Sequence, residues 1–254
     1  MPMIQCDFVS EVLKVSTSVN VILPQPVGVR KADNREKPVY PTLYLLHGLW
    51  DDHTVWTRQT SIERYVSSLG IAVVMPAVGR SFYTDMEYGP DYFTYITEEL
   101  PAICQEMFPL SDKREDTYVA GLSMGGYGAL KAALRCPENY RAAASLSGAV
   151  DLLDRTEDLY DDFRLIFGDR KVQDSEDDLF HLAQALAEGD SPRPSIYLNC
   201  GTEDYLVESN RRFRKHCENI SLDVTYEEYP GAHEWSYWDE QIQKVLEYFF
   251  KENR

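Results

Sequence analysis

The pentapeptide Gly121–Gly125, with the sequence GLSMG, carries the residue types that could perform chemistry. An apolar run typical of a strand, Thr117–Ala120, precedes it, and a helix-forming run, Tyr127–Leu134, follows it. A serine hydroxyl is a poor nucleophile unless the chain holds it beside a base, and a tight strand-to-helix turn flanked by glycines does this. The pattern therefore predicts that Ser123 is a nucleophile.

Such a serine needs a carboxylate and an imidazole, and both occur downstream in the order that a hydrolase sheet requires. Asp204 follows the predicted buried strand Ile196–Cys200. Strand ends at the carboxyl edge of a parallel sheet are where catalytic groups gather. The neighbouring Glu203 is the competing acid. We favour Asp204 because its shorter side chain suits a fixed orientation.

Five histidines compete for the role of base. His233 is favoured because a Pro-Gly turn displays it after the last predicted strand and because it completes the chain order of serine, acid and base. His47 ends a buried strand and is expected to orient the next loop, in which His53 is expected to border the substrate. His181 and His216 are expected at the surface.

A carbonyl oxygen that gains negative charge needs hydrogen-bond donors. The backbone N–H of Met124 opens the predicted helix after Ser123, where N–H groups have no partner within the helix. The second donor is expected in the loop after the first buried strand, Thr42–His47, and we choose the N–H of Leu49. Met124 and Leu49 are thus the predicted oxyanion donors.

Several aromatic side chains are expected in or beside the loops at the mouth of this site, namely Trp50, Trp56, Tyr83, Tyr127 and Trp235. The candidate substrate-binding residues are four of these, Trp50, Tyr83, Tyr127 and Trp235, together with His53. Aromatic faces could pack on a short acyl chain, a phenolic ring or a sugar. Ordinary packing is the competing interpretation for each of them, and the sequence does not choose among the three ester classes.

Buried-strand patterns alternate with helical patterns along most of the chain. They predict an α/β fold with a mostly parallel sheet, helices on both of its faces and right-handed crossovers. An antiparallel strand pair is expected before it, at residues 5–14 and 17–24. The other strands are expected at Thr42–His47, Ile71–Met75, Thr117–Ala120, Ala142–Leu146, Ile196–Cys200 and Asp223–Tyr229. Helical spacing covers Phe93–Met107 with a kink at Pro101, a basic stretch around 213–220, and 242–249.

We expect the 254 residues to form one domain. The acidic segment Asp151–Asp190 interrupts the alternation of strands and helices. It is expected to be an insertion, either a partial cap over the site or an excursion on the surface. The polar, turn-rich stretch Val27–Pro38 is expected to be a surface loop.

Composition excludes several function classes. The net charge of −17 argues against nucleic acid and anionic membrane as partners, because phosphates would be repelled. No apolar stretch approaches the length of a membrane span. The five cysteines are scattered and lack the spacing of a zinc site, so we expect free thiols, a reducing cytoplasm and no metal. No cofactor-binding pattern is visible either.

Five stretches of the sequence resemble a known family. They are LLHG at 45–48, GRSFY at 79–83, GLSMGGYGA at 121–129, CGTED at 200–204 and GAHEW at 231–235. Through them the chain resembles the esterase D branch of the α/β-hydrolases, and most closely the bacterial tributyrin esterases of the EstA type. That branch includes S-formylglutathione hydrolases, feruloyl and acetylxylan esterases, and mycolyltransferases. The resemblance implies an α/β-hydrolase fold, the triad Ser123, His233 and Asp204 with the same two oxyanion donors, activity on short acyl esters, and often homo-oligomers such as dimers or tetramers.

The leading hypothesis is a serine carboxylesterase that hydrolyses small-molecule esters of short acyl chains through an acyl-enzyme, without metal or cofactor. A feruloyl or acetylxylan esterase is an alternative. Thioester hydrolysis or acyl transfer by the same triad is another. Close S-formylglutathione hydrolases tend to have Ser-Gly-Leu followed by Cys where this chain has His47-Gly48-Leu49 followed by Trp50. A non-enzyme alternative is a binding module with a silent site, which predicts a disrupted triad.

Overall fold

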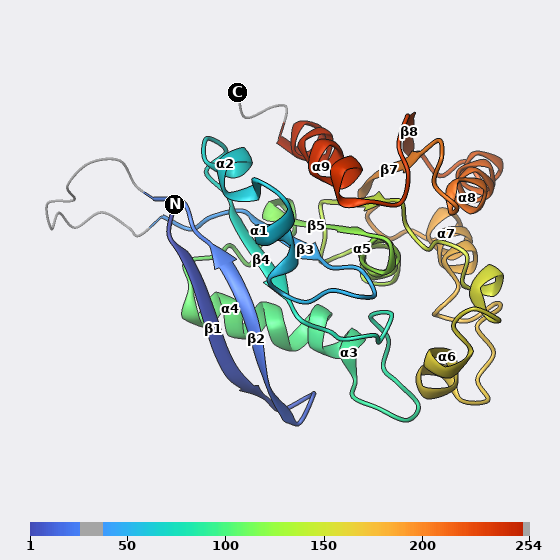
Figure 1. Cartoon of the computed structure of the whole chain (residues 1–254), viewed down its shortest axis with the longest axis horizontal. Coiled ribbons are helices and arrows are strands. Elements are labelled where there is room, and N and C mark those ends of the chain that lie inside the picture. The colour runs from blue at the N-terminus through green and yellow to red at the C-terminus, as the bar shows by residue number, and fades with distance from the viewer. Residues whose placement is uncertain (26–37, 251–254) are drawn as a thin grey trace, which may run out of the picture.

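The computed structural model describes residues 1–25 and 38–250, so the predicted loop Val27–Pro38 lies, apart from Pro38, outside the described residues. An eight-stranded sheet in the order β1-β2-β4-β3-β5-β6-β7-β8 runs through the molecule (Figure 1). Its strands are β1 (Met3–Ser10), β2 (Val15–Ile22), β3 (Thr42–Leu46), β4 (Ala72–Pro76), β5 (Thr117–Leu122), β6 (Ala142–Leu146), β7 (Ser195–Gly201) and β8 (Thr225–Tyr229). β1 and β2 pair antiparallel with their neighbours and every other pair is parallel. The predicted fold class is confirmed.

Helices cover both faces of the sheet because its central strands are apolar on both sides. In β3, Leu43 and Leu45 pack with α1 (Val55–Gln59), α2 (Ile62–Val66) and α9 (Trp235–Phe250). Tyr44 and Leu46 belong to the core on the opposite face. The helices of that face are α4 (Leu100–Met107), α5 (Met124–Arg135), α6 (Tyr160–Phe167), α7 (Leu179–Glu188) and α8 (Val207–Asn219). In Figure 1 the β1–β2 hairpin and the group α6, α7 and α8 lie at opposite sides of the view.

The first hairpin turns at a different place from the predicted one. The chain reverses between Ser10 and Val15, and Lys14 has a positive φ of 56°. The carboxylate of Glu99 accepts hydrogen bonds from the backbone N–H groups of Glu11 and Val12, at 2.7 and 3.2 Å. The turn is thus held by a distant residue, and its own sequence contains no Gly, Pro, Asn or Asp to mark it.

The helix predicted at Phe93–Met107 is present in three parts. α3 (Tyr92–Thr94) continues into a π-helical turn, Tyr95–Glu99, and then into α4. The wide turn ends just before Pro101, which has no N–H to donate to the preceding turn. Near the proline where a kink was predicted, the helix therefore changes from π-helical to α-helical geometry. The short helices α1 and α2 were not predicted, because five residues give no clear period.

The segment 151–190 divides into two parts. Its last helix, α7, packs against α5 and buries Leu179, Leu182, Ala183 and Leu186. This part belongs to the core. The remainder contains the 3₁₀ turn Leu152–Arg155 and α6, which lies away from α7 in Figure 1. Throughout residues 1–25 and 38–250, no helix is long and apolar enough to cross a membrane.

Candidate active site

Ser123 lies in a strained turn between β5 and α5. Its φ of 54° and ψ of −119° place it in a region that non-glycine residues rarely adopt. Its N–H donates to the carbonyl of Leu146 at 2.9 Å, and its carbonyl accepts from Ala149 at 3.1 Å. The turn is tight enough that a Cβ on Gly121 would lie 2.3 Å from the carbonyl oxygen of Gly125. The strand-to-helix turn predicted from the sequence is present, and its glycines are sterically required.

Two further glycines of α5 allow close packing, but against different partners. A Cβ on Gly126 would lie 2.5 Å from Oγ of Ser145 in β6, so this glycine lets the helix approach the sheet. A Cβ on Gly128 would lie 2.4 Å from the ring of Tyr83. Gly128 therefore makes room for the segment after β4 and not for the sheet.

His233 brings the three predicted catalytic side chains together. Its Nε2 lies 3.0 Å from Oγ of Ser123, and its Nδ1 lies 2.8 Å from Oδ2 of Asp204. The other carboxylate oxygen of Asp204 accepts from the N–H of Leu206 at 2.8 Å. A carboxylate facing Nδ1 favours the tautomer with the proton on Nδ1, which leaves Nε2 free to accept the serine proton. The Asp204 side chain is fully buried, whereas that of His233 is 16% exposed.

The competing acid, Glu203, has a different partner. It is exposed, and its carboxylate accepts hydrogen bonds from the N–H of Gly231 at 2.5 Å and from the hydroxyl of Thr202 at 2.8 Å. The bond from Gly231 is the main reason why the pKa of Glu203 is lowered. Glu203 thus fixes the turn that carries His233 and does not face the imidazole.

His47 connects the loop after β3 with the loop after β4. The N–H of Val78 donates to its Nε2 at 3.0 Å, so Nδ1 carries the proton and donates to the carbonyl of Gly48 at 2.7 Å. The ring is buried, and burial lowers its pKa to about 4. His47 is therefore a neutral linker at neutral pH. It holds the loop that begins at Gly48, as the sequence predicted.

The two predicted oxyanion donors line the same cavity as Ser123. Met124 is the first residue of α5. Leu49 follows Gly48, where a Cβ would lie 2.7 Å from the side chain of Leu122 and 3.7 Å from Cβ of Ser123. Within the described residues, neither the N–H of Leu49 nor that of Met124 has an assigned acceptor. Both donors remain available to a ligand beside Ser123.

The cavity around Ser123 has a volume of about 420 Å³. One part of its wall is apolar, with Phe82, Leu122, Met124, Ala149, Leu159 and Leu206. Another part is aromatic, with Trp50, Tyr205, Trp235 and Trp238, and the rim includes Asp51, Arg155 and Asp158. Arg155, Asp158 and Leu159 come from the segment 151–190, which therefore borders the cavity. A larger open groove of about 730 Å³ lies over α1 and α2, but no member of the predicted triad lines it.

Two of the five predicted substrate-binding residues lie on the cavity wall and three do not. Trp50 and Trp235 line it, and Trp50 is 87% exposed. Tyr83 and Tyr127 are buried in the core, where their hydroxyls donate to the carbonyls of His47 and Asp177 at 2.9 and 2.8 Å. The prediction that these two tyrosines bind substrate is wrong, because their rings are buried and do not line the cavity.

His53 is also absent from the cavity wall. α1 begins two residues later, and its buried Val55 and Trp56 draw this end of the loop into the core. Both ring nitrogens of His53 are buried without a hydrogen-bond partner within the described residues. The prediction that His53 borders the substrate is therefore wrong.

Sequence reasoning missed the aromatic neighbours of His233. The ring of Tyr205 lies 4.6 Å from the imidazole between centroids, and that of Trp238 lies 4.8 Å away at 90°. Tyr205 directly follows Asp204, and Trp238 lies about one helical turn after Trp235, so adjacency to the predicted triad could have indicated them. Across the described ranges, no group of three or more His, Cys, Asp or Glu side chains could hold a metal ion.

Comparisons with known proteins show similarity over nearly the whole chain. A family described as putative esterase matches residues 10–249 of the chain. An acetyl esterase of Caldicellulosiruptor saccharolyticus is 33% identical over 268 aligned residues, which cover 99% of each chain.

Two solved structures from Staphylococcus aureus match over 98% of this chain and 98% of their own. One is fluorophosphonate-binding serine hydrolase F with substrate bound, with a TM-score of 0.92 and 34% identity. The other is the apoenzyme of an S-formylglutathione hydrolase, with a TM-score of 0.88 and 33% identity. The similarity therefore covers the whole fold and is not confined to the turn around Ser123.

Proposed function

The chain belongs to this esterase family and is a carboxylic ester hydrolase, and from that premise we propose that Ser123, His233 and Asp204 are its catalytic triad and that it hydrolyses short-chain acyl esters. The observation that carries the proposal is the position of His233. Its two ring nitrogens lie at hydrogen-bond distance from the serine hydroxyl and from the buried carboxylate at the same time.

The first half of the proposed reaction forms an acyl-enzyme. His233 accepts the proton of Ser123 as Oγ attacks the ester carbonyl, and Asp204 stabilises the imidazolium that results. The carbonyl oxygen becomes negatively charged and accepts hydrogen bonds from the N–H groups of Leu49 and Met124. When this intermediate collapses, the C–O bond to the alcohol breaks and Nε2 of His233 returns the proton to the departing oxygen.

The second half releases the acid. Water loses a proton to His233 and attacks the acyl carbonyl, and a second oxyanion forms against the same two donors. Its collapse breaks the bond to Oγ of Ser123, which recovers its proton from His233. The strained backbone of Ser123 supports this cycle because it holds Oγ at the same place in both halves.

The cavity favours a small acyl group. Its volume of about 420 Å³ lies at the low end of the range for ligand sites, and apolar side chains surround Ser123. The aromatic wall of Trp50, Tyr205 and Trp235 suits an alcohol with a flat face, either a phenol or a sugar. Feruloyl and carbohydrate esters are therefore alternative substrates to simple alkyl esters.

Thioester hydrolysis is the second candidate function. The observation that favours it is the similarity over almost the full length to an S-formylglutathione hydrolase. The same triad would serve, because a thiolate leaves more readily than an alkoxide. Trp50 is the residue that separates the two candidates, since close S-formylglutathione hydrolases tend to have a cysteine at its position.

A substrate panel with one variant tests the proposal. Wild-type enzyme is expected to cleave p-nitrophenyl esters of short acyl chains, and Ser123→Ala is expected to lose this activity. Methyl ferulate, acetylated xylan and S-formylglutathione in the same panel distinguish the alternatives. Wild-type rates in Ser123→Ala would refute the proposed triad. Failure of the wild type to react with a fluorophosphonate probe would favour a binding module.

Two further expectations accompany this function. We propose that the enzyme works in the cytoplasm, since all five cysteines are free thiols. We also propose a homo-oligomer, a dimer or tetramer, on the basis of the resemblance to tributyrin esterases. Light scattering that gives the monomer mass of 29.2 kDa would refute the oligomer.

A further inference from the structure

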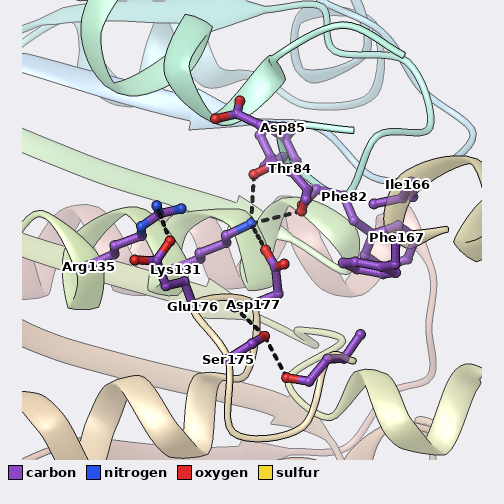
Figure 2. Close-up of polar contacts among 12 residues, drawn as sticks. Phe82, Thr84, Asp85, Lys131, Arg135, Ile166, Phe167, Ser175, Glu176 and Asp177 are labelled. Atoms are coloured by element: carbon purple, nitrogen blue, oxygen red, sulfur yellow. Dashed lines mark hydrogen bonds and ion pairs between the residues drawn. The ribbon is translucent and has the colours of Figure 1, made fainter. Parts of the chain in front are cut away.

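A buried lysine lies on the helix that begins at the nucleophile. Lys131 of α5 has no exposed side-chain surface. Its ammonium donates to the carboxylate of Asp177 at 2.5 Å, to the hydroxyl of Thr84 at 2.8 Å and to the carbonyl of Tyr83 at 3.3 Å (Figure 2). A buried charge is tolerated only when it is paired and its hydrogen bonds are satisfied. All three donors of Lys131 have partners, so the lysine joins three parts of the chain at one point.

The segment bound by Lys131 is strained. Phe82 and Tyr83 have positive φ values of 48° and 49°, in a region that favours glycine. The hydroxyl of Thr84 receives a hydrogen bond from Lys131 and donates one to the carbonyl of Phe82 at 2.9 Å. Two consecutive residues persist in this conformation only when surrounding contacts hold them there. Lys131 and Thr84 provide those contacts.

The segment 151–190 contacts the loop after β4, which contains Phe82–Thr84, on the side opposite Lys131. The ring of Phe163 in α6 packs edge-on against Phe82, with 5.4 Å between centroids. The N–H of Glu87 donates to the carbonyl of Ile166 at 2.8 Å. Asp177 lies beyond α6 in the same segment, and Figure 2 shows its carboxylate beside the ammonium of Lys131. The loop is thus held between α5 and this segment.

Through these contacts Lys131 is linked to the cavity without lining it. Phe82 lies on the cavity wall together with Ser123 and Met124. The hydroxyl of Tyr83 donates to the carbonyl of His47, immediately before the loop that carries Leu49. A shift in the strained segment would therefore move one wall of the cavity.

We propose that Lys131, held between Asp177 and the segment Phe82–Thr84, is a positioning residue that fixes the Phe82 wall and so sets the size of ester that the cavity accepts. The inference deepens the proposed function and depends on it, because selectivity among esters is its readout. Lys131 does not touch substrate in this account. Its effect passes through Thr84 and the backbone of Phe82 and Tyr83.

A neighbouring ion pair provides the matched control. Arg135 lies one turn after Lys131 on α5 and pairs with Glu176, the residue before Asp177. Figure 2 shows both pairs side by side. The Arg135 and Glu176 side chains are 30% and 68% exposed, so this pair connects the same two parts of the chain from the solvent side. An exposed pair contributes little.

The test measures kcat and KM for p-nitrophenyl acetate, butyrate and hexanoate. The variants are Thr84→Val, the double variant Lys131→Met with Asp177→Asn, and Arg135→Gln. Thr84→Val cuts the link to Phe82 but keeps the ion pair, and the double variant removes both buried charges together. We expect the ratio of kcat/KM for hexanoate over acetate to rise about tenfold in the first two variants, because pocket fit of a methylene carries effects of about this size. In Arg135→Gln the ratio should stay within about twofold of wild type.

An unchanged ratio in Thr84→Val and in the double variant, even with a lower melting temperature, would overturn the proposal and leave Lys131 a structural residue. If the double variant does not fold, Thr84→Val decides alone. Failure of the proposed function is recognised separately, since wild type and Arg135→Gln would then not cleave p-nitrophenyl acetate.

Discussion

Two regions around the cavity are built differently. The catalytic edge, as we define it, consists of the turns that directly follow strands β3, β5, β7 and β8, and it carries the proposed oxyanion donors Leu49 and Met124 and the proposed triad Ser123, Asp204 and His233. The mouth consists of the exposed side chain of Trp50, the loop after β4 and residues 151–178, and it is held by side-chain contacts between distant segments. One of these is the bidentate pair of Arg80 and Asp162, and another is Arg80 over the ring of Trp50 at 4.4 Å.

From this difference we infer that the reactivity of the serine and the selectivity among esters depend on separate sources of rigidity. The sheet fixes the catalytic edge through backbone hydrogen bonds and close glycine contacts, such as that between Gly121 and Gly125. The mouth depends on a few polar side chains, of which Lys131 is the most buried. Changes at the edge should therefore abolish turnover, whereas changes at the mouth should alter which esters are turned over.

The largest expected effect is at the catalytic edge. Asp204→Asn should lower kcat by about 10⁴-fold, because an amide no longer favours the imidazole tautomer that accepts the serine proton. Glu203→Gln is the matched control, since it changes the adjacent carboxylate that bonds to Gly231. Steady-state hydrolysis of p-nitrophenyl acetate measures both variants. A larger loss in Glu203→Gln than in Asp204→Asn would reverse the assignment of the acid.

An intermediate effect is expected at His47, which links the edge to the mouth. Its pKa is about 4 in the folded protein against 6.5 as the ordinary value, so the unfolded chain binds the proton more readily between these values. The contribution of neutral His47 to the free energy of unfolding is fully present above about pH 7. It is lost as the pH falls, by about 2 kcal/mol at about pH 5.

Urea unfolding at the two pH values measures this contribution. His47→Gln should lose less free energy of unfolding than the wild type on acidification, by about 2 kcal/mol. Substitution of the exposed His181 by Gln should leave the loss as in the wild type. Equal acid sensitivity in wild type and His47→Gln would show that this histidine is not held neutral by burial.

The smallest expected effect is at the mouth. Trp50→Ala removes an exposed ring that lines the cavity and stacks with Arg80. An exposed contact between this ring and an aromatic alcohol should contribute about 0.5–1 kcal/mol, so kcat/KM for an ester of an aromatic alcohol should fall by only about two- to fivefold. Hydrolysis of naphthyl acetate and of ethyl acetate, an ester of an aliphatic alcohol, by wild type and variant measures the change. A loss of several hundredfold would place Trp50 with the catalytic edge and break the comparison.

The catalytic edge could be predicted from the sequence because its signals are local. Ser123, Asp204 and His233 each lie within four residues of a strand end, and buried strands such as Thr42–Leu46 are continuous apolar runs. The order of serine, acid and base leaves His216 and His233 among the histidines, and the Pro-Gly turn after the last strand favours His233. The preference for Asp204 over Glu203 rested on side-chain length alone, and the structure supplies the direction in which each carboxylate points.

The mouth could not be predicted, because distant contacts determine its side-chain directions. Tyr83 and Tyr127 were predicted to bind substrate, yet their hydroxyls bond to His47 and Asp177 inside the protein. Nothing near Lys131 in the sequence indicates that Asp177 will be its partner, 46 residues away. A distant contact likewise explains why the turn of the first hairpin was predicted at the wrong place, because the carboxylate of Glu99 holds this turn.

The most direct test of Ser123 as the nucleophile is the site of covalent labelling by a fluorophosphonate probe, located by mass spectrometry of the digested protein. Such probes phosphonylate the activated serine of serine hydrolases. We expect one adduct per chain on Ser123, formed rapidly in the wild type, slowly in Asp204→Asn and not at all in Ser123→Ala. An adduct on another residue, or equal labelling of wild type and Ser123→Ala, would contradict it.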